Sequence, residues 1–75
     1  MTTNANILRS FRAATYRDLA REAVHQGWVL KVMGSSHVIV TNPANGEYVI
    51  LSQTAHEGGD VVKAKRSEFK RKGLR

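Results

Sequence analysis

One histidine of this 75-residue chain stands where a proton-transfer group could work. His37 follows Gly34-Ser35-Ser36 and opens the apolar run Val38-Ile39-Val40, so a tight turn is predicted to lead directly into a strand. Histidine has an unperturbed pKa near neutrality and is the side chain most often used as a general acid or base. The pattern has two interpretations: a small surface active site, or an ordinary histidine at the end of a strand.

Other groups that could do chemistry are sparse. His56 lies in a loop close to Thr54 and Glu57, where it is either a second proton carrier or an exposed loop residue. The histidines lack the spacing of a zinc site, and the sequence has neither a glycine-rich phosphate loop nor a cluster of carboxylates. It contains no cysteine, which excludes disulfides and thiolate chemistry. The sequence therefore predicts no metal and no cofactor.

The positive charge of the chain is concentrated near its C-terminal end. Twelve Lys and Arg residues stand against six Asp and Glu, which gives a net charge of +6. Residues 1–62 are balanced, so residues 63–75 hold the whole excess. A basic block of this kind favours a polyanionic partner, nucleic acid first, and the alternative is a solvated helix face with a charged tail. A phosphodiester cleaved by its own 2′-hydroxyl needs a base, nearby positive charge and a surface to hold the strand, and this chain offers all three.

Hydrophobic periodicity predicts the elements that position these residues. Apolar residues recur at helical spacing over 16–26, with Thr15 as the expected N-cap, Asp18 as its capping-box partner and Gly27 as the end of the helix. Period-two alternation then predicts three strands, over 28–33, 37–42 and 47–51. Asn45-Gly46 is a hairpin-turn signal between the last two strands. A second helix is expected over 60–72, ended by Gly73.

This order predicts an α+β fold, α-β-β-β-α, with a three-stranded antiparallel sheet and two helices on one of its faces. If Val38 and Val40 point at the helices, alternation puts His37, Ile39 and Thr41 on the open face. Residues 1–14 are expected to form an N-terminal arm, partly helical, before a single domain over 15–75. No segment is long and apolar enough to span a membrane and no signal peptide is evident, so a cytoplasmic location is expected.

The arrangement of these motifs resembles the HicA-type mRNA interferase toxins. The resemblance rests on Gly27-Trp28 before the first strand, on Gly34-Ser35-Ser36-His37, and on Lys72-Gly73-Leu74 at the end of the basic helix. It runs from about Tyr16 to Leu74. It implies a fold similar to a double-stranded-RNA-binding domain, which agrees with the order of elements predicted from periodicity. It also implies a metal-independent endoribonuclease that cleaves mRNA and is neutralised by a HicB-type antitoxin protein.

The resemblance implies roles for individual residues as well. His37 would act as the base, or as the acid, for attack of a 2′-hydroxyl on the neighbouring phosphate, and the turn at Gly34 and Ser35 would present it. Val38 stands where many relatives carry a second histidine, and His56 would be a displaced equivalent of a histidine that follows the third strand. The RNA backbone would be held by Lys31, Lys63, Lys65, Arg66, Lys70 and Arg71.

Two further functions stay open at the level of sequence. One is a non-catalytic RNA- or DNA-binding module of the same fold, which would use the basic helix for phosphate contacts. The other is a small interaction protein whose open sheet face, with Ile39, docks a partner protein.

Overall fold

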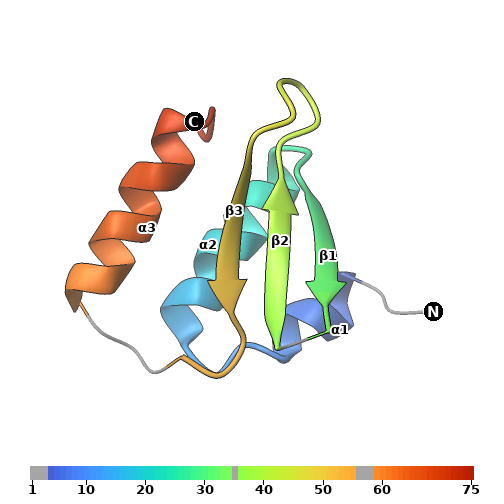
Figure 1. The fold of residues 1–75 in the computed structure, drawn as a ribbon, viewed down its shortest axis with the longest axis vertical. Coiled ribbons are helices and arrows are strands. Elements are labelled where there is room, and N and C mark those ends of the chain that lie inside the picture. Colours follow the sequence, from blue (N-terminus) through green and yellow to red (C-terminus); the bar gives the residue numbers. More distant parts are fainter. Residues whose placement is uncertain (1–3, 35, 56–58) are drawn as a thin grey trace.

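The computed structural model describes residues 4–34, 36–55 and 59–75. The predicted helix–strand–strand–strand–helix order is confirmed, and a short helix precedes it, within the segment that was expected to be partly helical (Figure 1). The elements are α1 (Asn4–Arg9), α2 (Ala14–His25), β1 (Val29–Met33), β2 (His37–Thr41), β3 (Tyr48–Ser52) and α3 (Gly59–Arg71).

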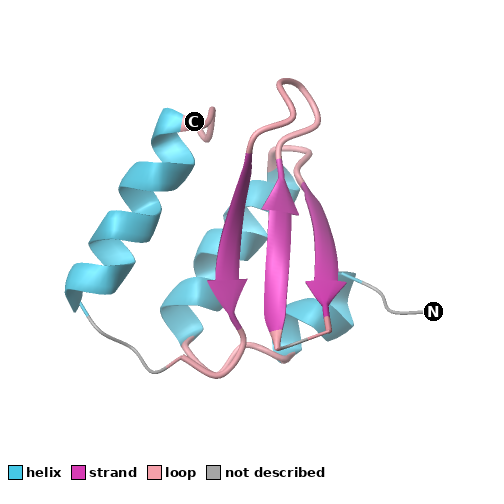
Figure 2. Ribbon diagram, viewed as in Figure 1, coloured by secondary structure: helices cyan, strands magenta, loops and turns pink. Residues whose placement is uncertain are grey.

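The three strands form one antiparallel sheet in the order β1-β2-β3. Val38 of β2 lies between Val32 of β1 and Leu51 of β3 in the register of the sheet. Figure 2 shows α1 and α2 behind this sheet, whereas α3 runs beside the β3 edge. The fold therefore covers one face of the sheet and one of its edges with helices.

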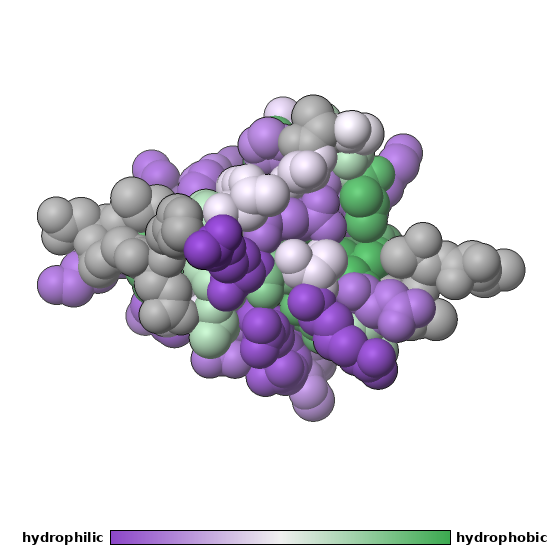
Figure 3. Space-filling model, turned by 90° about the horizontal axis from the view of Figure 1, so that it is seen from below, coloured by the Kyte–Doolittle hydropathy of each residue, from purple (hydrophilic) through white to green (hydrophobic). Residues whose placement is uncertain are grey.

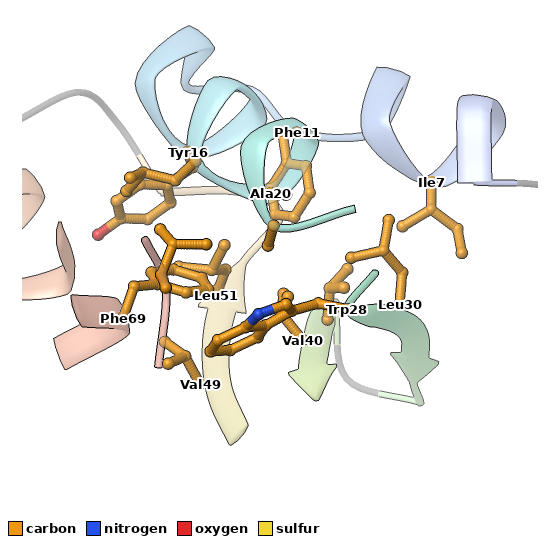
Figure 4. Close-up of a cluster of buried hydrophobic side chains, with 14 of the residues drawn as sticks. Ile7, Phe11, Tyr16, Ala20, Trp28, Leu30, Val40, Val49, Leu51 and Phe69 are labelled. Atoms are coloured by element: carbon orange, nitrogen blue, oxygen red, sulfur yellow. The ribbon is translucent and has the colours of Figure 1, made fainter. Parts of the chain in front are cut away.

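The hydrophobic core fills the space between the covered face of the sheet and the helices (Figure 4). Val38, Val40, Val49 and Leu51 have no exposed surface, because alternation directs all four to the same side. Helices and flanking segments supply the other half of the core, in which the rings of Trp28 and Phe69 lie 5.4 Å apart between centroids. Each fully buried side chain of this size contributes about 1.5–3 kcal/mol to stability.

Part of the segment predicted as an N-terminal arm belongs to this core. Ile7 of α1 is 5% exposed, and Phe11 and Ala13 are each 1% exposed. Ile7 and Phe11 point from the N-terminal segment toward the rest of the cluster in Figure 4. The residues that precede α2 therefore help to close the domain.

The predicted ends of the long helices are confirmed, but the predicted N-cap of α2 is wrong. α2 begins at Ala14, with Ala13 at the cap position and no side-chain capping hydrogen bond there. Ala13 is buried, and its carbonyl oxygen accepts a hydrogen bond from the Arg17 amide at 3.1 Å. Packing of Ala13, rather than the polar side chain of Thr15, sets the start of the helix. At the other end of the helix, Gly27 has a φ of 93°, the left-handed conformation expected of a glycine that ends a helix.

The end of α3 is held by two other parts of the chain. The side-chain amides of Asn42 and Asn45, in the β2–β3 turn, each donate a hydrogen bond of 3.0 Å to the carbonyl oxygen of Lys72. The Leu74 amide donates to the Phe69 carbonyl at 2.9 Å, which closes the helix in the manner expected after Gly73. The Arg75 amide donates to the side-chain oxygen of Gln26 at 2.7 Å, at the C-terminal end of α2.

Candidate active site

His37 lies at one end of the sheet, on the face that the helices leave open. In the register it stands between Met33 of β1 and Ser52 of β3, and its side chain is half-buried. Its neighbour Val38 is fully buried on the other face. The predicted alternation of β2 is therefore confirmed: His37, Ile39 and Thr41 share the open face.

The turn before His37 is shaped by Ser36. Ser36 has φ of 62°, the only positive value among the described residues other than glycine, and a non-glycine residue in this left-handed conformation is strained by about 1–2 kcal/mol. The carbonyl oxygen of Ser36 accepts a hydrogen bond from the Gln53 amide at 2.8 Å. A Cβ atom added at Gly34 would meet nothing within 4 Å, so this side of the turn is open. Ser35, also predicted to belong to this turn, lies outside the described residues.

Two segments distant in sequence meet beside this turn. The Arg12 amide donates to the Gln53 carbonyl at 2.9 Å, and the Gln53 side-chain amide donates to the Ser10 hydroxyl at 2.6 Å. The backbone of Gln53 thus connects two segments: its carbonyl group bonds to Arg12, before α2, and its amide group bonds to Ser36. Figure 3 views this end of the molecule and shows hydrophilic side chains gathered on it.

Arg12 is a residue of this region that the sequence analysis missed. Its side chain is exposed, whereas Phe11 and Ala13 on either side are buried. The burial of both neighbours and the backbone hydrogen bond to Gln53 fix the position of the Arg12 backbone, from which the side chain extends into solvent. The alternation of Phe11, Arg12 and Ala13 could have indicated an outward arginine, but nothing local in the sequence connects it to the end of β3.

Two lysines, one in α3 and one directly after it, lie along the edge of the sheet. Lys65 Nζ donates to the Ile50 carbonyl oxygen at 3.0 Å, and Lys72 Nζ donates to the Tyr48 carbonyl oxygen at 2.7 Å. Glu68 lies between them, 3.6 Å from Lys65 Nζ and 3.2 Å from Lys72 Nζ. Burial of Glu68 acts to raise its pKa, but the hydrogen bond from Lys72 and the charge of Lys65 outweigh burial, so the pKa of this carboxyl lies below its ordinary value of 4.5.

The other predicted RNA contacts fall into two regions. Lys31 is exposed on the open face of the sheet, where it stands beside Ile39 in the register. Lys63, Arg66 and Lys70 are exposed and spaced three and four residues apart, so they form one ridge along α3. Arg66 contacts Glu22 of α2 at 3.6 Å, which directs this ridge toward the helical side of the molecule. Arg71, the remaining predicted contact, is also exposed.

The described part of the chain offers little other chemistry. It contains no group of three or more His, Cys, Asp or Glu side chains that could hold a metal ion, and no pocket opens among its residues. None of its helices has the length and apolarity needed to cross a bilayer. His56, the predicted second proton carrier, lies outside the described residues.

Comparison with protein-family models, with curated proteins and with solved structures finds no match for this chain.

Proposed function

We propose that this protein is a metal-independent endoribonuclease, similar to the HicA-type mRNA interferases, in which His37 is the proton-transfer group. The observation that carries the proposal is the position of His37, half-buried on an open sheet face beside the strained residue Ser36. Backbone strain at a residue other than glycine is often found where a functional side chain must be presented. The net charge of +6 favours an anionic polymer as substrate.

In the proposed reaction the RNA supplies its own nucleophile. His37 takes the proton of a 2′-hydroxyl group, and the 2′-oxygen forms a bond to the adjacent phosphorus atom. The bond between phosphorus and the 5′-oxygen breaks, and that oxygen takes a proton from water or from the protonated histidine. The products are a 2′,3′-cyclic phosphate and a 5′-hydroxyl end. No step requires a metal ion or a cofactor.

Positive charge for the phosphate would come from Arg12 and Lys31. Lys31 shares the open face with His37, and the backbone of Arg12 is connected to that of Ser36 through Gln53. A positioned cation stabilises the charge that develops on the phosphate in the transition state. By the same proposal the protein acts on mRNA in the cytoplasm and is neutralised by a HicB-type antitoxin.

The direct test measures cleavage of end-labelled RNA by the purified protein in the presence of a chelator. His37→Ala should lower the cleavage rate at least about 100-fold, with the circular dichroism spectrum unchanged. His25→Ala is the matched control, because His25 is exposed on α2, and it should cleave like the wild type. Equal cleavage by His37→Ala would remove His37 from the mechanism.

A second pair of variants tests the phosphate contact. Arg12→Gln removes a charge and should lower the cleavage rate about tenfold or more. Arg9→Gln removes an exposed charge from α1 and should have little effect. Equal losses in the two variants would mean that only the net charge matters and that Arg12 has no specific role.

One observation favours a second candidate, a non-catalytic nucleic-acid-binding module. The ridge of Lys63, Arg66 and Lys70 is directed toward the helical side, away from the face that carries His37. A protein that used only this ridge would bind RNA or DNA without cleaving it. Its binding constant would fall steeply with salt, with a slope of about 0.7 per neutralised phosphate on a single strand, and binding would survive His37→Ala.

A further inference from the structure

The open face of the sheet is a grid of nine side chains in three rows. The first row is Met33, His37 and Ser52, and the last is Val29, Thr41 and Tyr48, with Lys31, Ile39 and Ile50 between them. Val29 is 54% exposed, Met33 37% and Tyr48 50%. These are large apolar side chains to leave in water, and Val32 is the only other large hydrophobic residue exposed to this extent among those described.

The charge of this face restricts what can cover it. None of the nine residues is acidic, and Lys31 is exposed at the middle of β1. The apolar centre offers Ile39 and Ile50, both half-buried. A surface that is apolar in the middle and positively charged at its side suits a ligand with flat apolar groups on an anionic backbone.

Tyr48 is the largest aromatic side chain of the grid, and the ammonium group of Lys72 lies beside it. Lys72 Nζ lies 5.4 Å from the centroid of the Tyr48 ring and is held there by the Tyr48 carbonyl and by Glu68. The lysine thus keeps a positive charge beside an exposed aromatic ring. Stacking of a nucleic-acid base on an aromatic side chain, with a cation for the phosphate, is the usual way in which proteins bind single strands.

We infer that the open face binds single-stranded RNA, with one base stacked on Tyr48 while the phosphate to be cleaved lies at His37. Tyr48 and Ser52 stand at opposite ends of β3, about 13 Å apart at the usual rise of a strand. The four-stranded sheets of some RNA-binding domains stack two or three bases on their aromatic side chains. The inference rests on the proposed function for the place of cleavage, and it adds the class of substrate and a residue that recognises it.

Duplex RNA does not suit this face. In a duplex the flat surfaces of the bases are stacked inside the helix, so that only groove edges and phosphates remain accessible. The nine-residue grid offers apolar and aromatic contacts for which a duplex has no partner. A single strand, or an unpaired loop, can place its bases on Tyr48, Ile39 and Ile50.

The test uses His37→Ala protein, so that the RNA stays intact, and measures fluorescence anisotropy of a labelled oligoribonucleotide. The single strand should bind more tightly than the same strand annealed to its complement. Adding Tyr48→Ala should weaken binding of the single strand about tenfold, whereas Tyr48→Phe should stay within about twofold. Val32→Ala is the control, because Val32 is an exposed apolar residue that the alternation of β1 places on the opposite face.

The outcomes separate this inference from the proposed function. If wild-type protein cleaves RNA but Tyr48→Ala binds the single strand as tightly as its parent, or if duplex binds at least as tightly as single strand, the inference is wrong and the face is left for a protein partner. If binding depends on Tyr48 but wild-type protein does not cleave, the proposed function fails and the binding surface stands. Absence of any RNA binding would overturn both.

Discussion

Ser36 adopts the left-handed backbone conformation although glycine would adopt it at lower cost. Because Ser36 directly precedes His37, its backbone conformation sets the direction in which the chain enters β2 at His37. Backbone strain of this kind persists where the surrounding structure enforces it. At Ser36 it is consistent with a role of the turn in positioning His37.

Ser36→Gly should therefore stabilise the folded protein by about 1 kcal/mol, because the strain of a Cβ atom at positive φ is removed. Urea denaturation followed by circular dichroism measures the change. Gly34→Ala is the matched control in the same turn: its Cβ would meet open space, so stability should change by less than about 1 kcal/mol. A loss of stability in Ser36→Gly would show that the serine side chain makes a stabilising contact.

The sequence predicts those features of the site that depend on local pattern. The face of His37 follows from strict alternation in β2, and the glycines at positions 27 and 73 mark real helix ends. The neighbourhood of Arg12 and Gln53 was not predictable, because it depends on a contact between segments about 40 residues apart. The N-cap at Thr15 was mispredicted for a related reason: burial of Ala13, a tertiary effect, overrides the local capping preference.

At the scale of elements, α3 protects the β3 edge of the sheet. An edge strand exposes unpaired backbone groups that can pair with another molecule, and here Lys65 and Lys72 occupy the outward carbonyl oxygens of Ile50 and Tyr48. Lys65 was predicted as an RNA contact, and the structure shows its ammonium group hydrogen-bonded to the sheet edge. A helical wheel does not distinguish a lysine that caps a strand from one that faces solvent.

The double variant Lys65→Met/Lys72→Met should lose about 1–3 kcal/mol of stability and self-associate at high concentration, because it uncovers those carbonyl oxygens. Size-exclusion chromatography with light scattering detects the association. Lys63→Met/Lys70→Met removes the same charge from exposed positions of α3 and should remain unassociated. Association of both double variants would show that added apolar surface, rather than edge exposure, is the cause.

Glu68 gives the contact between α3 and β3 a dependence on pH. Its pKa is lower in the folded state than the ordinary 4.5, so its ionised form stabilises the fold above that pH. This contribution is lost as pH falls through the lowered folded-state pKa. Glu68→Gln should be less stable than wild type at pH 7, and the difference should shrink on acidification below about pH 4.5, as measured by urea denaturation at each pH. A constant difference would indicate that Glu68 acts through packing alone.

The whole molecule is small enough for single core residues to decide whether it folds. A domain of this size has about 5–15 kcal/mol of stability, and its N-terminal segment supplies Ile7 and Phe11 to the core. Truncation of Ile7 or Phe11 is therefore expected to act on folding.

Phe11→Ala should cost about 3–5 kcal/mol, as expected for a large buried aromatic residue, and should unfold the domain or lower its melting temperature sharply. Phe11→Leu keeps most of the volume and should cost markedly less. Thermal melts followed by far-ultraviolet circular dichroism give both values. If Phe11→Ala melts like the wild type, the N-terminal segment is dispensable to the core.

The hydrogen bonds that join Arg75 to Gln26, and Lys72 to the β2–β3 turn, connect positions up to 49 residues apart. They have a consequence for synthesis. A ribosome makes the chain from its N-terminus, and the nascent sheet cannot bury Trp28, or shield the edge of β3, until α3 has emerged. Until then those surfaces are open to wrong partners. The same delay keeps Lys72 from its place beside Tyr48, so the proposed single-strand site would gain this cation last.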